Sequence, residues 1–147
     1  MDSTRRKKIG ELLLERRIID SDKLDKGLKH QKDSGKLLGE CLIELGYLTE
    51  DVLTQTLAVQ LEIPYISLKH YTLDPKLVAL LPADIIRNRN ILPLDRIGRI
   101  TTVAACDVLN EEVVAELEKH FQTKIKYFLA TVSDLKQAID KYFLKNK

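Results

Sequence analysis

The chain has 147 residues, of which 44% are apolar, so it can build the core of one ordinary domain or of two small subdomains. Lysine and arginine number 24 against 22 acidic residues, and the net charge of +2 is too small to predict a general affinity for nucleic acid or membrane surfaces. Charge is unevenly distributed along the chain. Residues 1–36 hold eleven basic and seven acidic side chains, whereas residues 37–75 hold one basic and six acidic side chains. The first part of the chain is therefore basic and the next part acidic.

Cys41 and Cys106 are the only cysteines, and they lie far apart in apolar segments. We interpret both as small buried side chains and expect no disulfide. No apolar run approaches the roughly 20 residues that span a bilayer. The start of the chain also lacks the continuous apolar block of a signal peptide. We therefore expect a cytoplasmic protein with no direct membrane insertion.

An internal repeat occupies the N-terminal part of the chain. Residues 9–31 align with residues 38–60 at a constant offset of 29 positions and without a gap. The identical pairs are Gly10 with Gly39, Glu11 with Glu40, Leu13 with Leu42, Glu15 with Glu44, Asp22 with Asp51, Leu24 with Leu53, Leu28 with Leu57, and Gln31 with Gln60. So many identities in one register predict that the two segments fold alike.

Each copy of the repeat predicts two helices joined by a tight turn. In the second copy Gly46 suits a left-handed helix cap, Thr49 is a good N-cap for the second helix, and that helix must end before Pro64. In the first copy Arg17 stands at the position of Gly46. A non-glycine residue at positive φ costs about 1 kcal/mol. We therefore expect the first turn to be altered.

Beyond Pro64 the pattern predicts short alternating elements. They are a strand at 65–68, a helix at 75–86 broken at Pro82, a hairpin of 91–95 with 99–106, a helix at 110–121, a strand at 125–130, and a last helix with Ser133 as its N-cap. The predicted fold class is α+β. A tandem helix-turn-helix repeat forms an all-α subdomain at 1–62, with copies at about 8–31 and 37–60. A small α+β subdomain with a sheet of about three strands follows at 63–147.

The sequence offers no catalytic machinery. A nucleotide-hydrolysing domain needs a glycine-rich phosphate loop, and the nearest candidate is Gly35 with Lys36. It fails because His30 stands where the first glycine belongs and Leu37 where a magnesium-binding serine or threonine belongs. The three histidines are distant in sequence, and none shares a helical face with another metal-type ligand. We predict no enzyme activity, no catalytic residue and no metal site.

The spacing of the two copies resembles the N-terminal domain of type II secretion and type IV pilus assembly ATPases, including the variant of that domain that binds cyclic di-GMP. In that family two 24-residue motifs each begin near an arginine, a leucine and a glycine and end on leucines and a glutamine at fixed spacing. Here the motifs run from Lys8 to Gln31 and from Leu37 to Gln60. The resemblance continues through LEIPYISL, LLPADIIRNRNILPLD, VAACDVLNEEVV and ATVSDLKQAIDKYF, and so covers nearly the whole chain.

The resemblance implies a non-catalytic docking domain without a cofactor. Its partner would be the cytoplasmic domain of an inner-membrane secretion or pilus platform protein, and it would serve an ATPase domain in the same chain or in a separate one. It implies a cytoplasmic location, held at the inner membrane through that partner, and no nucleic-acid partner. The alternative is a cyclic di-GMP receptor. Its binding residues would be Lys8, Ile9, Gly10, Leu24, Leu28, Gln31, Leu37, Leu38, Gly39, Leu53, Leu57 and Gln60.

Within that alternative, the apolar residues would form floors for the bases, the glutamines would donate and accept hydrogen bonds, and an arginine at each motif start would grip phosphate or base. This sequence departs at the motif starts, because Lys8 keeps only the charge and Leu37 keeps neither the charge nor the planar fork. A charge-assisted hydrogen bond contributes about 1.5–3 kcal/mol, so affinity should fall by about two orders of magnitude. The same leucines are more simply explained as helix–helix core, because both interpretations require the same apolar stripe. A helix-turn-helix DNA binder is a weaker alternative, because the acidic second copy would repel phosphate.

Overall fold

The computed structural model describes residues 8–145, so the first seven residues of the predicted N-terminal subdomain lie outside the described part. The chain divides into two compact units, with the boundary between Glu62 and Ile63. Among the described residues there are eight helices and one three-stranded sheet. The predicted α+β class is therefore confirmed.

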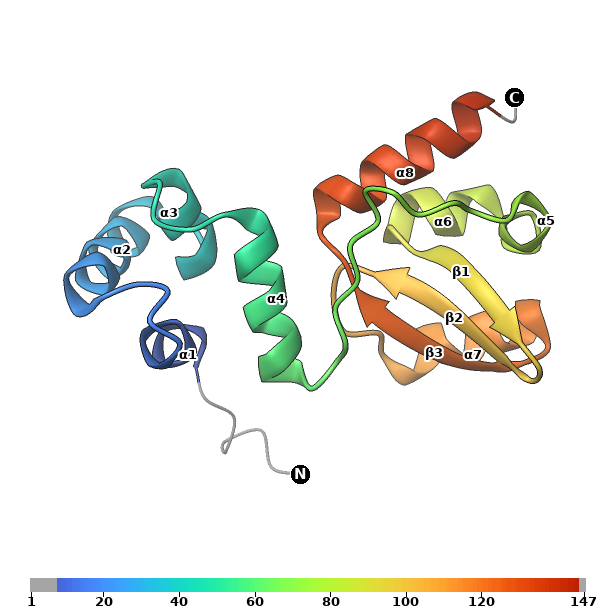
Figure 1. Cartoon of the computed structure of the whole chain (residues 1–147), viewed down its shortest axis with the longest axis horizontal. Coiled ribbons are helices and arrows are strands. Elements are labelled where there is room, and N and C mark those ends of the chain that lie inside the picture. Colours follow the sequence, from blue (N-terminus) through green and yellow to red (C-terminus); the bar gives the residue numbers. More distant parts are fainter. Residues whose placement is uncertain (1–7, 146–147) are drawn as a thin grey trace. The chain divides into compact units, whose positions relative to one another are not determined.

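The N-terminal unit is a tandem pair of helix-turn-helix copies, as predicted (Figure 1). Its helices are α1 (Ile9–Glu15), α2 (Ser21–Ser34), α3 (Leu38–Glu44) and α4 (Glu50–Leu61). The second helix of each copy begins after a side-chain cap, because Asp20 accepts a hydrogen bond from the backbone N–H of Lys23 at 2.9 Å and Thr49 accepts one from that of Val52 at 3.2 Å. The two copies therefore use the same start signal at equivalent positions.

The turn of the first copy is not altered, so that expectation was wrong. Arg17 adopts a left-handed φ of 58°, and Gly46 adopts 81° at the equivalent position. In both turns two backbone N–H groups donate hydrogen bonds to carbonyls of the preceding helix. In the first turn Arg17 donates to Leu14 at 3.0 Å and Ile18 donates to Leu13 at 3.0 Å. In the second turn Gly46 donates to Ile43 and Tyr47 donates to Leu42. These two hydrogen bonds satisfy carbonyls at the helix end and offset the cost of a positive φ at Arg17.

The core of the N-terminal unit is built from equivalent residues of the two copies. Leu13 and Leu42 are fully buried, and Ile19 and Leu48 are 4% and 7% exposed. Each pair is separated by the repeat offset. Contacts between copies are reciprocal, since α2 packs on α3 and α4 packs on α1. Each copy therefore completes the core of the other.

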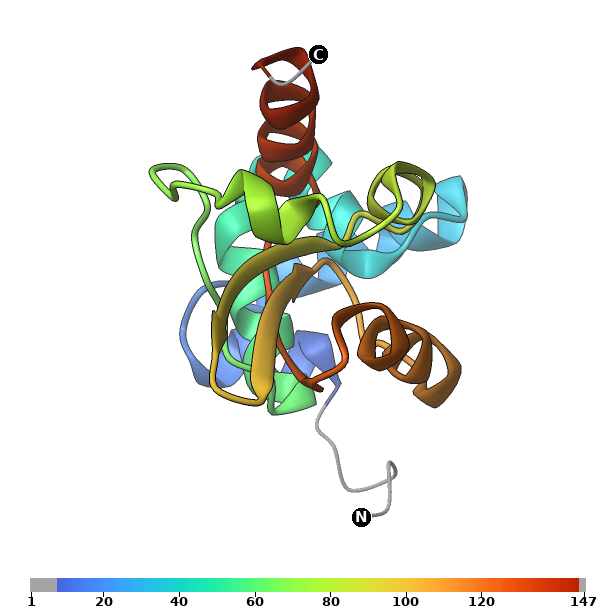
Figure 2. The same ribbon diagram turned by 90° about the vertical axis from the view of Figure 1, so that its right-hand side faces the viewer.

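The C-terminal unit surrounds a three-stranded sheet in the order β1-β2-β3. Its elements are α5 (Pro75–Val78), α6 (Ala83–Arg89), β1 (Leu92–Ile97), β2 (Ile100–Ala105), α7 (Glu111–Phe121), β3 (Lys124–Leu129) and α8 (Val132–Lys145). β1 and β2 form the predicted hairpin, whereas β3 runs parallel to β2 after the crossover through α7. Figures 1 and 2 show α6 beside α8, where Arg87 lies 3.8 Å from Asp140 and over the ring of Phe143. The core is continuous from α5 to α8.

Two local expectations for the C-terminal unit need correction. The segment 65–68 is not a named strand, because it makes only one parallel bridge, between Tyr65 and Leu129. Ser133 is not the cap of the last helix, because Thr131 accepts the hydrogen bond from the N–H of Asp134 at 3.0 Å and the helix begins at Val132. Within the described residues, no helix combines the length and the apolar character that crossing a membrane requires.

The shared turn geometry predicts opposite effects for a pair of exchanged residues. Arg17→Gly should raise the free energy of unfolding by a few tenths to about 1 kcal/mol, because glycine removes the strain of positive φ while adding some freedom to the unfolded chain. Gly46→Arg should lower it by about 1 kcal/mol. Urea unfolding followed by circular dichroism measures both changes. Effects of the same sign in the two variants would contradict this account of the turns.

Candidate functional site

The two motif starts have nearly the same backbone geometry. Lys8 precedes α1 with φ −68° and ψ 152°, and Leu37 precedes α3 with φ −67° and ψ 149°. Both side chains are exposed, Leu37 to 70%. The structure therefore offers equivalent places for a side chain at the two motif starts, even though the present residues differ in charge.

Six of the twelve residues predicted to bind a ligand hold the helices together. They are Ile9, Gly10, Leu24, Leu38, Gly39 and Leu53. A Cβ built on Gly10 would lie 3.2 Å from Leu24 and 3.4 Å from Leu38, and one built on Gly39 would lie 2.7 and 2.9 Å from the two methyl carbons of Leu53. Each glycine therefore lets a leucine side chain of its own copy pack directly against the helix backbone. The fold explains these residues without a ligand.

The other six predicted residues are at least partly accessible. Lys8, Leu28 and Leu37 are exposed, and Gln31, Leu57 and Gln60 are half-buried. Leu28 is 45% exposed and lies outside the buried core of the unit, as does Leu37. Burial of apolar surface stabilises by roughly 25 cal/mol per Å², so two exposed leucines in one unit are surface that a partner or ligand would cover favourably.

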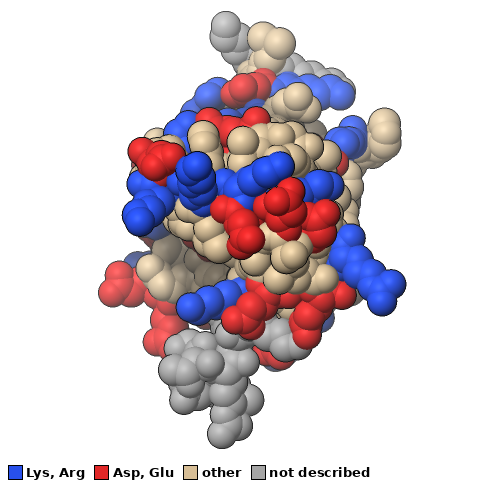
Figure 3. All heavy atoms as spheres, turned by 90° about the vertical axis from the view of Figure 1, so that its left-hand side faces the viewer, with Lys and Arg blue, Asp and Glu red and all other residues tan. Residues whose placement is uncertain are grey.

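Charges of both signs interleave on the face that carries α2 and α3 (Figure 3). Helix α2 carries four lysines and three aspartates, and it packs on α3, whose charged residues are two glutamates. Lys36 Nζ lies 2.6 Å from Glu44 Oε2, and Lys26 pairs with Asp22 within α2. Such exposed pairs contribute little stability. They do determine the pattern of surface charge that a partner would contact.

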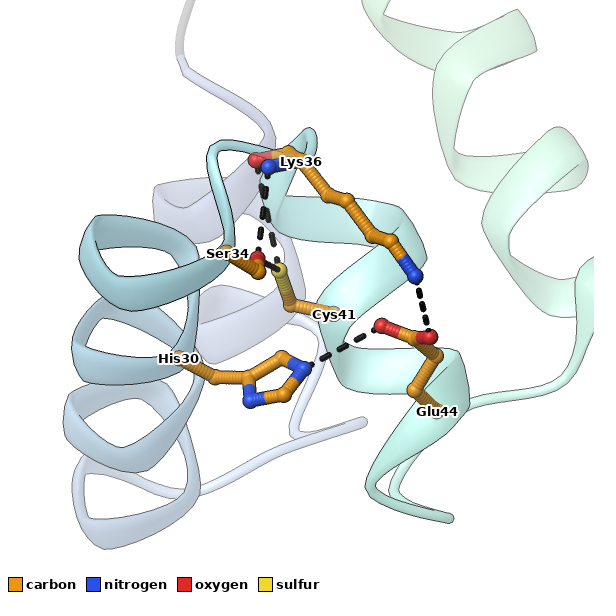
Figure 4. A network of polar contacts seen from close by, with 5 residues as sticks. All are labelled: His30, Ser34, Lys36, Cys41 and Glu44. Carbon is orange, nitrogen blue, oxygen red and sulfur yellow. Dashed lines mark hydrogen bonds and ion pairs between the residues drawn. The ribbon is translucent and has the colours of Figure 1, made fainter.

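Three side chains with metal-ligating atoms meet between α2 and α3, which sequence spacing did not predict. They are His30, Cys41 and Glu44, and their nearest ligand atoms all lie within 4.8 Å of one another (Figure 4). Cys41 and Glu44 share a face of α3, but His30 comes from the neighbouring helix. A search for ligands along single helices therefore could not find the cluster.

Glu44 is the centre of this network. Its carboxylate lies 3.1 Å from His30 Nε2 as well as 2.6 Å from Lys36 Nζ. The hydrogen bond from Lys36, followed by that from His30, lowers the pKa of the Glu44 carboxyl below its usual value. The same bond raises the pKa of the Lys36 ammonium. The glutamate is therefore ionised and positioned by both neighbours.

A pocket in the C-terminal unit lies between the segment before α5 and helix α8. Its lining includes Leu68, Tyr71, Leu73, Asp134 and Tyr142. The carboxylate of Asp134 accepts the N–H of Leu68 at 3.2 Å, and burial raises the pKa of the Tyr71 hydroxyl, which donates to the Leu94 carbonyl at 3.0 Å. These polar atoms are engaged in holding the segment to the rest of the unit. No sequence motif pointed to this pocket.

The repeat and the α+β unit together have the architecture of the N-terminal domains of secretion and pilus ATPases. A structure of MshE with cdg (cyclic di-GMP) has a TM-score of 0.76 and 32% sequence identity to this chain, and the alignment covers 93% of this chain and 99% of the other. The N-terminal domain of XpsE has a TM-score of 0.63 at 18% identity, with 96% of both chains covered, and shows likeness of fold alone.

Sequence comparison identifies the family of the chain. The MshEN domain model matches residues 61–146, more than half of the chain, so the chain belongs to the MshEN domain family. It is 29% identical over 136 residues to the type IV pilus assembly ATPase PilB of Myxococcus xanthus and 27% identical over 139 residues to that of Thermus thermophilus. These alignments cover 92% and 93% of this chain but only 24% and 16% of the relatives. The chain therefore corresponds to a small part of those proteins.

The close approach of Leu53 to Gly39 predicts the sign of one substitution. If Gly39 served only a ligand, Gly39→Ala would stabilise α3 by roughly 0.5–1 kcal/mol through helix propensity. We expect a loss of about 1–3 kcal/mol instead, because the new methyl group meets both methyl carbons of Leu53. Urea unfolding without ligand decides between the two. Gly10→Ala is the matched control, since its nearest atom is 3.2 Å away and the loss should be smaller.

Proposed function

We propose that this chain is a non-catalytic N-terminal module of a type IV pilus or type II secretion ATPase system, and that it docks the motor to a partner protein. The carrying observation is that nearly all of this chain aligns with a small part of the PilB relatives. An ATPase domain, in the same chain or in a separate one, would supply the hydrolysis. The partner would be the cytoplasmic domain of an inner-membrane platform protein, which would hold this module at the cytoplasmic side of the membrane.

The surroundings of Gly35 and Lys36 support a non-catalytic role. In a phosphate loop the glycines follow a strand and their backbone N–H groups surround the phosphates at a helix start. Here Gly35 caps the end of α2 with φ 75°, and the Lys36 ammonium is bound to Glu44. The only lysine that follows a glycine in this chain is thus engaged in an ion pair between two helices.

A pair of matched substitutions tests docking through the repeat. Leu28→Glu should weaken binding to the purified cytoplasmic domain of the platform protein from the same organism by roughly ten-fold or more, because a buried charge replaces an apolar contact. Ile97→Glu, at a residue 74% exposed in the C-terminal unit, is the control and should leave binding unchanged. Biolayer interferometry on the full chain measures both. A loss confined to the Ile97 variant would place docking on the other unit, against the proposal.

The similarity to MshE with cyclic di-GMP favours a second candidate function, dinucleotide binding by the repeat. The intact turn at Arg17 supports it, because both copies keep the same backbone frame. Lys8 and Leu37 oppose it, because neither presents the planar donor fork of arginine. The accessible residues left to make contact are Leu28, Gln31, Leu57 and Gln60 together with the two motif starts.

Restoring arginine at both motif starts should therefore increase affinity for cyclic di-GMP. The natural chain should bind weakly or not at all, and Lys8→Arg combined with Leu37→Arg should bind about two orders of magnitude more tightly. Titration calorimetry on both proteins measures the difference. Leu80→Arg, at a residue 45% exposed in the C-terminal unit, controls for added charge. Tight binding by the natural chain would show that the arginines are not required.

A further inference from the structure

The cluster of His30, Cys41 and Glu44 has the composition of a transition-metal site. An imidazole nitrogen, a thiolate and a carboxylate oxygen are the three ligand types that zinc takes in proteins. Three protein ligands leave one of the four tetrahedral positions for water. In Figure 4 the His30 ring and the Glu44 carboxylate face each other between α2 and α3, and the Cys41 side chain lies beside them with its sulfur toward Ser34. The cluster joins the two copies of the repeat, since His30 belongs to the first copy and the other two belong to the second.

The distances suit a tetrahedral ion after small side-chain movements. Bonds to zinc of about 2.0–2.3 Å place neighbouring ligand atoms roughly 3.3–3.8 Å apart. His30 Nε2 and Glu44 Oε1 are 3.1 Å apart, and all three ligand atoms lie within 4.8 Å of one another. The limit of 4.8 Å exceeds the tetrahedral spacing by about 1–1.5 Å, which adjustment of the side-chain torsions can close.

The environment of each ligand supports the same interpretation. Cys41 is fully buried, and among the described residues its sulfur contacts Ser34 Oγ at 3.6 Å and the carbonyl of Lys36 at 4.0 Å. The side chains of His30 and Glu44 are 37% and 42% exposed, so an ion can enter from the solvent side. Lys36 holds Glu44 through Oε2, which leaves Oε1 as the atom nearest His30. An outer contact of this kind orients a ligating carboxylate.

The other junction between the copies provides an internal comparison. Shifted by the repeat offset, His30, Cys41 and Glu44 correspond to Val59, Leu12 and Glu15. Neither valine nor leucine can bind a metal ion. The three-ligand set is therefore a property of the α2–α3 junction and not a by-product of the repeat.

We propose that the α2–α3 junction binds one divalent transition-metal ion of the zinc class through His30 Nε2, Cys41 Sγ and Glu44 Oε1. Binding releases the thiol proton of Cys41 to the solvent, and His30 gives up its hydrogen bond to Glu44 and binds through Nε2 as the neutral ring with its proton on Nδ1. The thiolate and the carboxylate then balance the two charges of the ion. Because the ligands come from both copies, the ion clamps α2 to α3 and stabilises the N-terminal unit. This inference does not depend on the proposed docking or dinucleotide function.

Titration of the tag-free full chain with Zn²⁺ tests the site directly. We expect one ion per chain with a dissociation constant of about 1 μM or tighter, together with a rise in the unfolding temperature that a chelator reverses. With Co²⁺ as the probe, a thiolate-to-cobalt charge-transfer band should appear in the near ultraviolet. Failure to bind one ion per chain, or a cobalt complex without the thiolate band, would overturn the proposal.

Two substitutions identify the ligands. His30→Asn changes a partly exposed side chain and should weaken Zn²⁺ binding roughly ten-fold or more while the fold is kept. Cys41→Ala should remove the cobalt band, with circular dichroism confirming its fold. His70→Asn and Cys106→Ser, both in the C-terminal unit, are the matched controls and should bind as the natural chain does. Undiminished binding by His30→Asn would mean that other groups take the ion and that the cluster is an ion-pair network only.

Discussion

The N-terminal unit depends on close contact between helices that could not persist alone. α1 and α3 have seven residues each, whereas isolated helices shorter than about 12–15 residues are marginal in water. Reciprocal packing between the copies removes Leu13 and Leu42 from water completely. Glycine makes this approach possible, since a Cβ on Gly27 would lie 2.6 Å from Leu42 Cδ2. The leucine and glycine spacing of the repeat is therefore first a requirement of packing.

This requirement changes how the repeat motif should be interpreted. A sequence can match the motif at Gly10, Leu24, Gly39 and Leu53 because it must pack these helices, whether or not it binds a ligand. Ligand chemistry depends on the smaller accessible set, and at the motif starts that set differs between the copies. A match to the repeat motif and ligand binding are thus decided by different residues. The match to the family model lies at residues 61–146, outside the repeat, and ligand binding rests on the exposed side chains of the repeat.

Local signals in the sequence predicted most of the helices and strands. The caps Asn110 and Thr49 and the break at Pro82 act through bonds within a few residues, and each helix begins or ends where these signals indicate. Arg17 was predicted wrongly because propensity weighs the strain of one residue and not the two backbone bonds that offset it. Thr131 was missed because Thr131 and Ser133 are both acceptable caps, and the sequence alone does not show at which of the two the helix begins. The cluster around His30 was missed because it forms only when α2 packs on α3.

The two junctions between the copies differ in their side chains, whereas the backbone that carries them is nearly the same. The backbone at Lys8 matches that at Leu37, and the turn at Arg17 matches that at Gly46. Side chains at the surface are free to change under such a frame, because the buried core, the helix caps and the turn hydrogen bonds maintain it. One junction has a histidine and a cysteine where the other has valine and leucine. A partner or ligand of this repeat therefore contacts two copies with different surface side chains. The surface of this pseudo-symmetric fold thus favours one orientation of the partner.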